Sequence, residues 1–455
     1  MRRVLLVEPA HRGRFPPLGL MKLSTYHKRR GEQVSFVRGC DPQLASQRWD
    51  RVYVSSLFTY TWAVTVRTIQ YYMRCVEEPS QTVVGGVLAT LMGDELREAT
   101  GVRIVRGLLD TPGELDRGDH TCIDTLMPDY GLLDEVDFDY DPSDAYITYA
   151  TRGCPNHCDF CAVNQLEPEF VEYVPIRPQV KRVNRVFGPR QHLVLLDNNV
   201  LASSALERII GDIEDLGFHR GAKFDGRIRK VDFNQGLDLR RFDARAASLL
   251  SRIAIKPIRL AFDWLSLKKQ FRERVAIAVD HGLTTISTYV LYNYRDTPAD
   301  FYQRLRIGVE LGRQHGIQLS SFPMKYVPLD AKDRSYVGPH WNRRLLRGVQ
   351  CILLATRGMV GTKLDFFEAA FGATPEEFIE IAMMPDDYII FRRDNADNGA
   401  AEWRKDYRRL TANQLETFTE IIGPNRRLDP AIFGRRMTKR VRRLLEHYPV
   451  RSDGR

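Results

Sequence analysis

Short apolar runs recur along the first 125 residues and are separated by amphipathic stretches. The strand candidates are 3–7, 33–39, 51–57, 82–90 and 101–107. Between the first two, Leu20, Leu23 and His27 recur at helical spacing, and a second helix is expected over 61–75. Short apolar strands that alternate with helices predict a parallel sheet covered on both faces. Residues 1–126 are therefore expected to form a Rossmann-like, doubly wound α/β domain.

A second alternating region follows an acidic, weakly periodic stretch at 127–143, which we interpret as a linker. Its strand candidates are 145–151, 192–197, 230–236, 257–263, 285–292 and 317–327, with helices expected over 204–216, 241–253, 266–281 and 299–315. Six β–α repeats predict a partial (β/α)6 TIM-type barrel over 144–330. The pattern from 331 to 455 is mostly helical and predicts a separate C-terminal domain.

Polar residues stand where these six strands end, which is where barrels of this kind carry their chemistry. Three cysteines follow the first strand, and Asp197, Asn198 and Asn199 follow the second. Asn234 and Gln235 lie at the end of the third strand, and Asp263 ends the fourth. The expected site is therefore the mouth of the partial barrel.

Charge is concentrated at the C-terminus. Residues 426–455 hold ten Lys and Arg side chains against three Asp and Glu, and so carry most of the net charge of +9. Within 435–451, Met437, Val441, Leu444 and Leu445 stand at near-helical spacing, which predicts an amphipathic basic helix. Such a helix either docks its apolar face and leaves its charge in solvent or follows phosphate groups, so nucleic acid is an alternative partner for this segment.

The chain is expected to be cytoplasmic. No run of about 18 apolar residues predicts a membrane span, and the apolar run Val4–Val7 ends at Glu8, too early for a signal peptide. Seven cysteines, three of them clustered, favour metal chemistry in a reducing compartment over a disulfide framework.

The clustered cysteines lie in TRGCPNHCDFCAVNQ (151–165), where Cys154, Cys158 and Cys161 form C-x3-C-x2-C. Thiolates favour soft metals and iron–sulfur clusters. Three ligands on one short loop favour a [4Fe–4S] cluster with one open iron. The alternative is zinc, normally closed by a fourth ligand, from His157 or a distant Cys351. With the basic tail, this alternative describes a zinc-containing nucleic-acid-binding protein.

This loop resembles that of the radical S-adenosylmethionine (SAM) superfamily. The resemblance rests on C-x3-C-x2-C after the first barrel strand, on the aromatic Phe160 before the last cysteine, and on Gly153 before the first. It covers about residues 145–327. It implies that the three cysteines hold a [4Fe–4S] cluster, that SAM chelates the fourth iron, and that a reductant such as flavodoxin or ferredoxin supplies the electron. It also implies an oxygen-sensitive enzyme that cleaves SAM to a 5′-deoxyadenosyl radical and takes hydrogen from a substrate that the sequence does not reveal.

The chain departs from the family's Gly-Gly-Glu-like motif, because LLDNNVLAS (195–203) stands in its place and resembles an Asp-containing variant. Asp197 or Asn198 can accept from the SAM ammonium; the alternative is an Asx-capped turn. Arg259 either pairs with the SAM carboxylate or makes an internal ion pair with Asp263. The candidate cofactor contacts are Phe160, Asp197, Asn198, Asn199, Gln235, Arg259, Asp263, Tyr289, Asn293 and Met324. For Tyr289, Asn293 and Met324, packing roles are equally open.

The N-terminal region resembles the cobalamin-binding domains fused to many radical SAM enzymes, through FPPLGLMKLSTYHKRRGEQVSFV and VVGGVLA. Those domains often carry Asp-x-His-x-x-Gly, which is absent here, and His11 lacks that context. Cobalamin is therefore not favoured, and a cobalamin-dependent radical methyltransferase is the alternative enzyme. The other cysteines are Cys40, Cys75, Cys122 and Cys351; they are far apart in sequence and indicate no second cluster.

Overall fold

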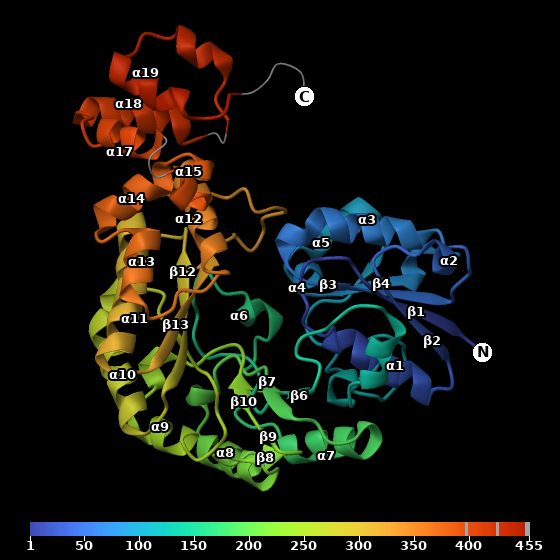
Figure 1. The fold of residues 1–455 in the computed structure, drawn as a ribbon. Helices are drawn as coiled ribbons and strands as arrows, with labels where there is room; N and C mark the ends of the chain where they lie inside the picture. Colours follow the sequence, from blue (N-terminus) through green and yellow to red (C-terminus); the bar gives the residue numbers. More distant parts are fainter. Residues whose placement is uncertain (396–398, 425–426, 451–455) are drawn as a thin grey trace. The chain divides into compact units, whose positions relative to one another are not determined.

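The computed structural model describes residues 1–395, 399–424 and 427–450 (Figure 1). The chain forms two compact units. The first unit consists of residues 1–241, 245–256 and 327–336. The second consists of residues 242–244, 257–326 and the described residues from 337 onward.

The first unit opens with a five-stranded parallel sheet in the order β2-β1-β3-β4-β5. Its strands are β1 (Arg3–Glu8), β2 (Gln33–Arg38), β3 (Arg51–Ser56), β4 (Thr82–Gly86) and β5 (Arg103–Ile104). Strand β1 pairs on both sides, and its run Val4–Val7 is fully buried because both faces are covered. Figure 1 shows α1 (Leu18–Arg29) on one face and α3 (Trp62–Met73) and α5 (Gly93–Thr100) on the other. The predicted parallel α/β architecture is confirmed.

Some predicted strands are longer than the observed ones: the strand predicted over 101–107 is only Arg103–Ile104, and another runs on into a helix. The stretch predicted over 82–90 is a strand only to Gly86, after which α4 (Val87–Leu91) begins. Gly86 has a φ of +99°, and a Cβ there would lie 2.2 Å from the carbonyl oxygen of Ser56. Only glycine permits this turn beside β3. The apolar Leu88 and Ala89 are buried from a helix, which a short apolar run does not distinguish from a strand.

A second, three-stranded parallel sheet lies in the first unit in the order β10-β7-β6. Its strands are β6 (Ala145–Thr148), β7 (His192–Leu195) and β10 (Val231–Phe233). Helices α6 (Val163–Leu166), α7 (Ile176–Phe187), α8 (Leu206–Asp215) and α9 (Ala244–Leu250) accompany it, and β8 (Lys223–Phe224) pairs antiparallel with β9 (Arg227–Ile228). The predicted linker is anchored to this sheet, because the Ile147 amide donates to the Tyr130 hydroxyl over 2.8 Å.

The second unit contains a parallel sheet in the order β11-β12-β13. Its elements are β11 (Ile258–Ala261), α10 (Lys268–Asp280), β12 (Thr285–Tyr292), α11 (Pro298–Gln314) and β13 (Gln318–Lys325). All six strands expected between 145 and 327 are thus present, with the expected helices between them. They are arranged as two three-stranded sheets in different units, so closure into one partial barrel stays a prediction.

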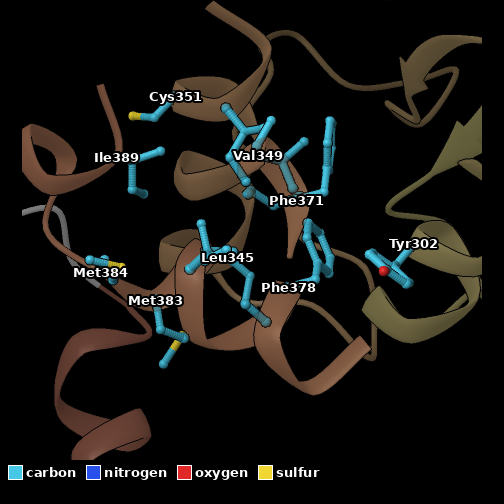
Figure 2. Close-up of a cluster of buried hydrophobic side chains, with 14 of the residues drawn as sticks. Tyr302, Leu345, Val349, Cys351, Phe371, Phe378, Met383, Met384 and Ile389 are labelled. Atoms are coloured by element: carbon cyan, nitrogen blue, oxygen red, sulfur yellow. The ribbon is translucent and has the colours of Figure 1, made fainter. Parts of the chain in front are cut away.

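Helices fill the described part of the chain after β13, as the sequence predicts. They are α12 (Arg343–Ala355), α13 (Leu364–Phe371), α14 (Pro375–Met383), α15 (Asp386–Ile390), α16 (Arg392–Asn395), α17 (Ala401–Tyr407), α18 (Ala412–Ile422) and α19 (Lys439–Glu446). Figure 2 shows Tyr302 of α11 beside Phe378 in the core these helices form. The Tyr302 hydroxyl donates to the Gly372 carbonyl over 2.9 Å. These helices and the β11-β12-β13 sheet therefore share one hydrophobic core.

The basic helix predicted over 435–451 is α19, which is shorter. Its Val441, Leu444 and Leu445 are buried in the core of the second unit, which supports the docking interpretation of its apolar face. Three of its cations are used internally: Arg440 donates to the Arg409 carbonyl over 2.9 Å, Arg442 donates to the Phe433 carbonyl over 2.8 Å, and Arg443 pairs with Asp406 over 2.9 Å. Of the ten basic residues in 426–455, Arg426, Arg451 and Arg455 lie outside the described residues.

None of the helices in the described ranges combines the length and the apolar character that crossing a bilayer requires.

Candidate functional site

The cysteine loop leaves the end of β6 and is tied to the end of β7 by Asp197. The Asp197 carboxylate is completely buried and accepts hydrogen bonds from the amides of Ala150 (3.0 Å) and Thr151 (2.5 Å) and from the Thr151 hydroxyl (2.7 Å). Its oxygens therefore face the backbone just before the cysteines. This geometry gives Asp197 a positioning role; contact with SAM, which the sequence suggests, stays a prediction for this residue.

The ionisation of Asp197 predicts a pH-dependent stability. Burial raises the pKa of Asp197 from 3.8 to about 6, against the opposing hydrogen bonds from Thr151 and Ala150. The folded state then holds the proton more tightly than the unfolded state, so stability falls as pH rises between these two values. Relative to Asp197→Asn, the wild type is expected to lose up to about 3 kcal/mol of unfolding free energy between about pH 4 and about pH 7. Denaturant titrations of both proteins measure this; a pH-independent difference would contradict it.

Glu167 fixes the next part of the loop. It accepts from the Gly153 amide over 2.7 Å and from the Asn198 side chain over 3.0 Å, and it pairs with Arg152 over 3.3 Å. The Asn198 amide is thus used to hold Glu167. Gly153 has a φ of +68°, and a Cβ there would lie 2.2 Å from the Glu169 carbonyl oxygen. The glycine before the first cysteine is therefore required by the backbone.

Gly153→Ala is expected to disorganise the cysteine loop and to lower its metal content strongly. The added Cβ would clash with backbone atoms, which cannot move aside without a large cost in free energy. The left-handed conformation costs an alanine about 1–3 kcal/mol in addition. Gly221→Ala is the matched control, because Gly221 has a φ of +75° and nothing within 4 Å of the added atom. Iron content after anaerobic reconstitution, compared between the two variants, measures the effect. Equal iron content in both would contradict the steric argument.

Asn199 places an amide beside the first cysteine. Its Nδ2 donates to Cys154 Sγ over 3.4 Å and also lies 3.3 Å from Asp238 Oδ2. The residue is only 2% exposed, and its Oδ1 has no hydrogen-bond partner among the described residues. An unpaired buried acceptor is costly, so this oxygen suits a ligand that brings an N–H donor.

Asp238, like Glu167, is a residue at this site that sequence reasoning missed. Its side chain is only 8% exposed and accepts from Asn156 over 2.9 Å and from the Arg240 guanidinium over 2.8 and 3.0 Å. The one available signal was local: the Arg240 amide also donates to Asp238 over 3.0 Å, as in an Asx turn. Gln235, which the sequence did suggest, is exposed, whereas Phe160 and the three cysteines are half-buried.

Three other candidates share one face of the second unit's sheet. The register places Arg259 beside Ser287 and Ser320, Tyr289 beside Phe322, and Leu291 beside Met324. Side chains alternate between faces along a strand, so Arg259, Tyr289, Phe322 and Met324 lie on the same face. The Arg259 guanidinium lies 5.9 Å from the Tyr289 ring centre, and the Tyr289 and Phe322 rings lie 6.1 Å apart. Phe322, 42% exposed, is missed by the sequence analysis, although strand alternation from Met324 could have found it.

Asn293 is buried, and its side chain is hydrogen-bonded to the backbone of the second unit. It is fully buried in a left-handed conformation with a φ of +68°. Its Nδ2 donates to the Tyr326 carbonyl over 3.2 Å, and its Oδ1 accepts from the Gly338 amide over 2.8 Å. This favours the packing interpretation for Asn293.

Asp263, at the end of β11, is held through its backbone. The fully buried Arg304 of α11 donates to the carbonyl oxygens of Asp263 (2.7 Å), Leu291 (2.6 Å) and Phe262 (3.3 Å). Arg304 also pairs with Asp296 over 2.7 Å. One guanidinium therefore joins the carboxyl ends of β11 and β12.

A cavity of about 330 Å³ opens at the carboxyl ends of the five-stranded sheet in the first unit. Its lining is mostly apolar, from α1, β3 and β4, and it includes the small residues Ser55, Ser56, Gly85 and Gly86. Ligands of open parallel sheets bind at this edge, where the strand order reverses, here between β1 and β3. The volume falls within the range of small-molecule sites.

His11 lines this cavity, but both of its ring nitrogens are used. Nδ1 accepts from the Gly13 amide over 3.1 Å, and Nε2 lies 3.3 Å from the buried Glu8 carboxylate. Burial lowers the pKa of His11 and raises the pKa of Glu8. The neutral imidazole is therefore oriented by the protein and does not present a nitrogen to a metal.

Among the residues that the structure describes, no group of three or more His, Cys, Asp or Glu side chains is placed to hold a single metal ion. Thiolate ligands of a cluster bind different iron atoms, so they need not converge on one point. The observations that fit a cluster are the three half-buried thiols on one anchored loop and the unpaired Asn199 oxygen beside them.

Comparison with known proteins finds a similar fold. No family model matches the chain, and no curated protein matches its sequence. A solved structure of the radical S-adenosylmethionine methyltransferase TsrM from Kitasatospora setae, with tryptophan substrate and the SAM analogue aza-SAM bound, superposes with a TM-score of 0.50. The match is 16% identical and covers 77% of this chain and 76% of the other. At this identity the likeness is one of fold: the chain has a fold similar to that of a radical SAM methyltransferase.

Proposed function

We propose that the protein is a radical SAM enzyme in which Cys154, Cys158 and Cys161 hold a [4Fe–4S] cluster. The observation that carries this proposal is the anchored loop: it holds three half-buried thiols, and the Asn199 side chain, whose Oδ1 is unpaired among the described residues, contacts the first of them. The donor set suits the group, because cysteine thiolates are the usual ligands of iron–sulfur clusters. When bound, a reduced cluster supplies the electron that cleaves SAM to methionine and a 5′-deoxyadenosyl radical.

The protein's own residues would bind and orient. Asp197, Gly153 and Glu167 fix the loop, and Asn199, oriented by Cys154 and Asp238, presents an oxygen that can accept from the SAM ammonium.

The test is an anaerobic reconstitution with iron and sulfide, followed by addition of SAM and dithionite and identification of the SAM fragments by mass spectrometry. 5′-Deoxyadenosine above the level of a Cys154→Ala/Cys158→Ala/Cys161→Ala triple variant supports the proposal. A protein that holds a full cluster but gives 5′-methylthioadenosine would break a different carbon–sulfur bond and would contradict the proposed cleavage. A protein that binds one zinc and no cluster would contradict the proposal entirely.

Cobalamin-dependent methyl transfer is the second candidate, favoured by the cavity in the first unit and by the fold shared with a methyltransferase. The small residues Gly85 and Ser56 at the strand ends would let a planar ligand approach the backbone. Because both His11 nitrogens are used, this cofactor would bind without His11 as a cobalt ligand.

Gly85→Phe tests whether the cavity binds the cofactor of the second candidate. A Cβ at Gly85 meets only the Val105 carbonyl oxygen, at 3.8 Å, so a phenyl ring can fill the cavity without a backbone clash. If a corrinoid binds there, Gly85→Phe is expected to abolish binding of hydroxocobalamin, measured by visible absorption after desalting. Gln43→Phe on α2 (Pro42–Ala45), which does not line the cavity, is the control. Equal cobalamin retention in both variants would place any corrinoid elsewhere.

A further inference from the structure

The hydrogen bonds around Asp238 reach two of the three cysteines. Asp238 Oδ2 accepts from Asn199, and the same Asn199 Nδ2 lies 3.4 Å from Cys154 Sγ. Asp238 also binds Arg240 through both carboxylate oxygens, and the Arg240 guanidinium makes a side-chain hydrogen bond to Cys158. One buried carboxylate therefore orients one donor toward each of two thiols.

The same carboxylate ties the cysteine loop to the turn after β10. Asn156, between the first two cysteines, donates to Asp238 Oδ2 over 2.9 Å. Its own carbonyl accepts from Asn164 over 3.0 Å. Asp238 therefore binds Asn156 within the cysteine loop and also Asn199 and Arg240 outside it. Because Asp238 is buried, each of these hydrogen bonds is stronger than it would be in solvent.

Donors to a thiolate sulfur stabilise negative charge. A cluster gains one negative charge on reduction, so N–H donors and a nearby cation favour its reduced form and raise its reduction potential. Arg240 contributes a full positive charge, whereas Asn199 contributes a dipole. The effect of Arg240 is therefore expected to be the larger.

We propose that Asp238 is a positioning residue that holds Arg240 and Asn199 against the sulfurs of Cys158 and Cys154, and that these two donors set the reduction potential of the cluster. This inference rests on the proposed function. It concerns residues of the first unit only, and it does not depend on the identity of the substrate.

Arg240→Met is the central test, because the Arg240 side chain is 52% exposed and its removal costs little packing. The midpoint potential of the reconstituted cluster is measured without SAM by an anaerobic titration followed by electron paramagnetic resonance, together with iron content. Arg240→Met is expected to shift the reduction equilibrium at least about tenfold toward the oxidised cluster, about 59 mV for one electron. Arg240→Lys, which keeps the charge, is expected to restore at least half of this shift.

Arg241→Met is the matched control. Arg241 lies 3.9 Å from Asp238 and is similarly exposed, so the variant removes the same charge one residue away. Its shift is expected to be well below that of Arg240→Met. Asn199→Leu, which removes the donor to Cys154 at similar volume, is expected to lower the potential by less than Arg240→Met.

Asp238→Asn tests positioning by the sign of its effect. If Asp238 holds the donors in place, its replacement frees them and lowers the potential. If it acts only as a negative charge, its replacement raises the potential and the positioning role is overturned. Unchanged potentials in all variants that hold a wild-type amount of iron overturn the whole inference and leave the proposed function standing.

The remaining outcomes are also decisive. If Arg240→Met loses the cluster and Arg240→Lys keeps it, the result supports the requirement for a cation beside Cys158. Loss from both variants overturns a role based on charge. A wild-type protein that forms no [4Fe–4S] signal overturns the proposed function, and the inference with it.

Discussion

Single alanine substitutions of Cys154, Cys158 and Cys161 are each expected to abolish SAM cleavage and to reduce iron content to the level of the triple variant. Each thiolate would hold a different iron, and a cluster left with two protein ligands is exposed to solvent and lost. Iron and sulfide content, together with the yield of 5′-deoxyadenosine, measure the effect after identical anaerobic reconstitution.

The matched controls are Cys40→Ala and Cys122→Ala, which remove thiols of the same unit that lie outside the loop. Both are expected to keep the iron content and the product yield of the wild type. A single-loop variant that keeps its cluster and cleaves SAM would show that its cysteine is no ligand and would contradict the assignment.

Arg304→Met is expected to lower the free energy of unfolding by about 3–5 kcal/mol, the usual effect of breaking a buried ion pair from one side. The substitution leaves Asp296, whose carboxylate is 6% exposed, without its cation. It also removes the donor shared by the carbonyl oxygens of Asp263 and Leu291. Denaturant titration followed by circular dichroism measures the change.

Arg313→Met, an exposed arginine in the last turn of the same helix, is the control and is expected to change stability by less than about 0.5 kcal/mol. Asp296→Asn combined with Arg304→Met is expected to recover part of the loss, because no unpaired charge is then buried. A double variant as unstable as Arg304→Met alone would assign the loss to the carbonyl contacts instead of the ion pair.

The elements of the fold were largely predictable, because a strand that is buried on both faces of a parallel sheet has a continuous run of apolar residues. Val4–Val7 is an example: a central strand shows as an uninterrupted apolar run. One exception is Val87–Leu91, which an apolar run alone does not identify as a helix. Its identity as a helix depends on Gly86, whose turn is imposed by the carbonyl of a neighbouring strand.

The candidate site was predictable only where its residues are neighbours in sequence. The spacing of Cys154, Cys158 and Cys161 is visible in eight positions. In contrast, Asp197 anchors an amide 47 residues earlier, and Asp238 binds an asparagine 82 residues earlier. Such pairs form because two strands end at the same edge of a sheet, and one sequence without its fold does not reveal which polar groups meet there.

The docking of α19 changes how the basic end of the chain can be studied. Leu428, Leu444 and Tyr448 belong to the buried core of the second unit, and the Tyr448 hydroxyl donates to the Met383 carbonyl. A truncation before Leu428 would therefore uncover an apolar surface and cause aggregation before it reported on any anionic partner. Charge reversal at the exposed Arg435 and Arg436 changes the positive charge at this end of the chain and leaves the core intact. These substitutions therefore separate the effect of charge from the effect of unfolding, which a truncation does not.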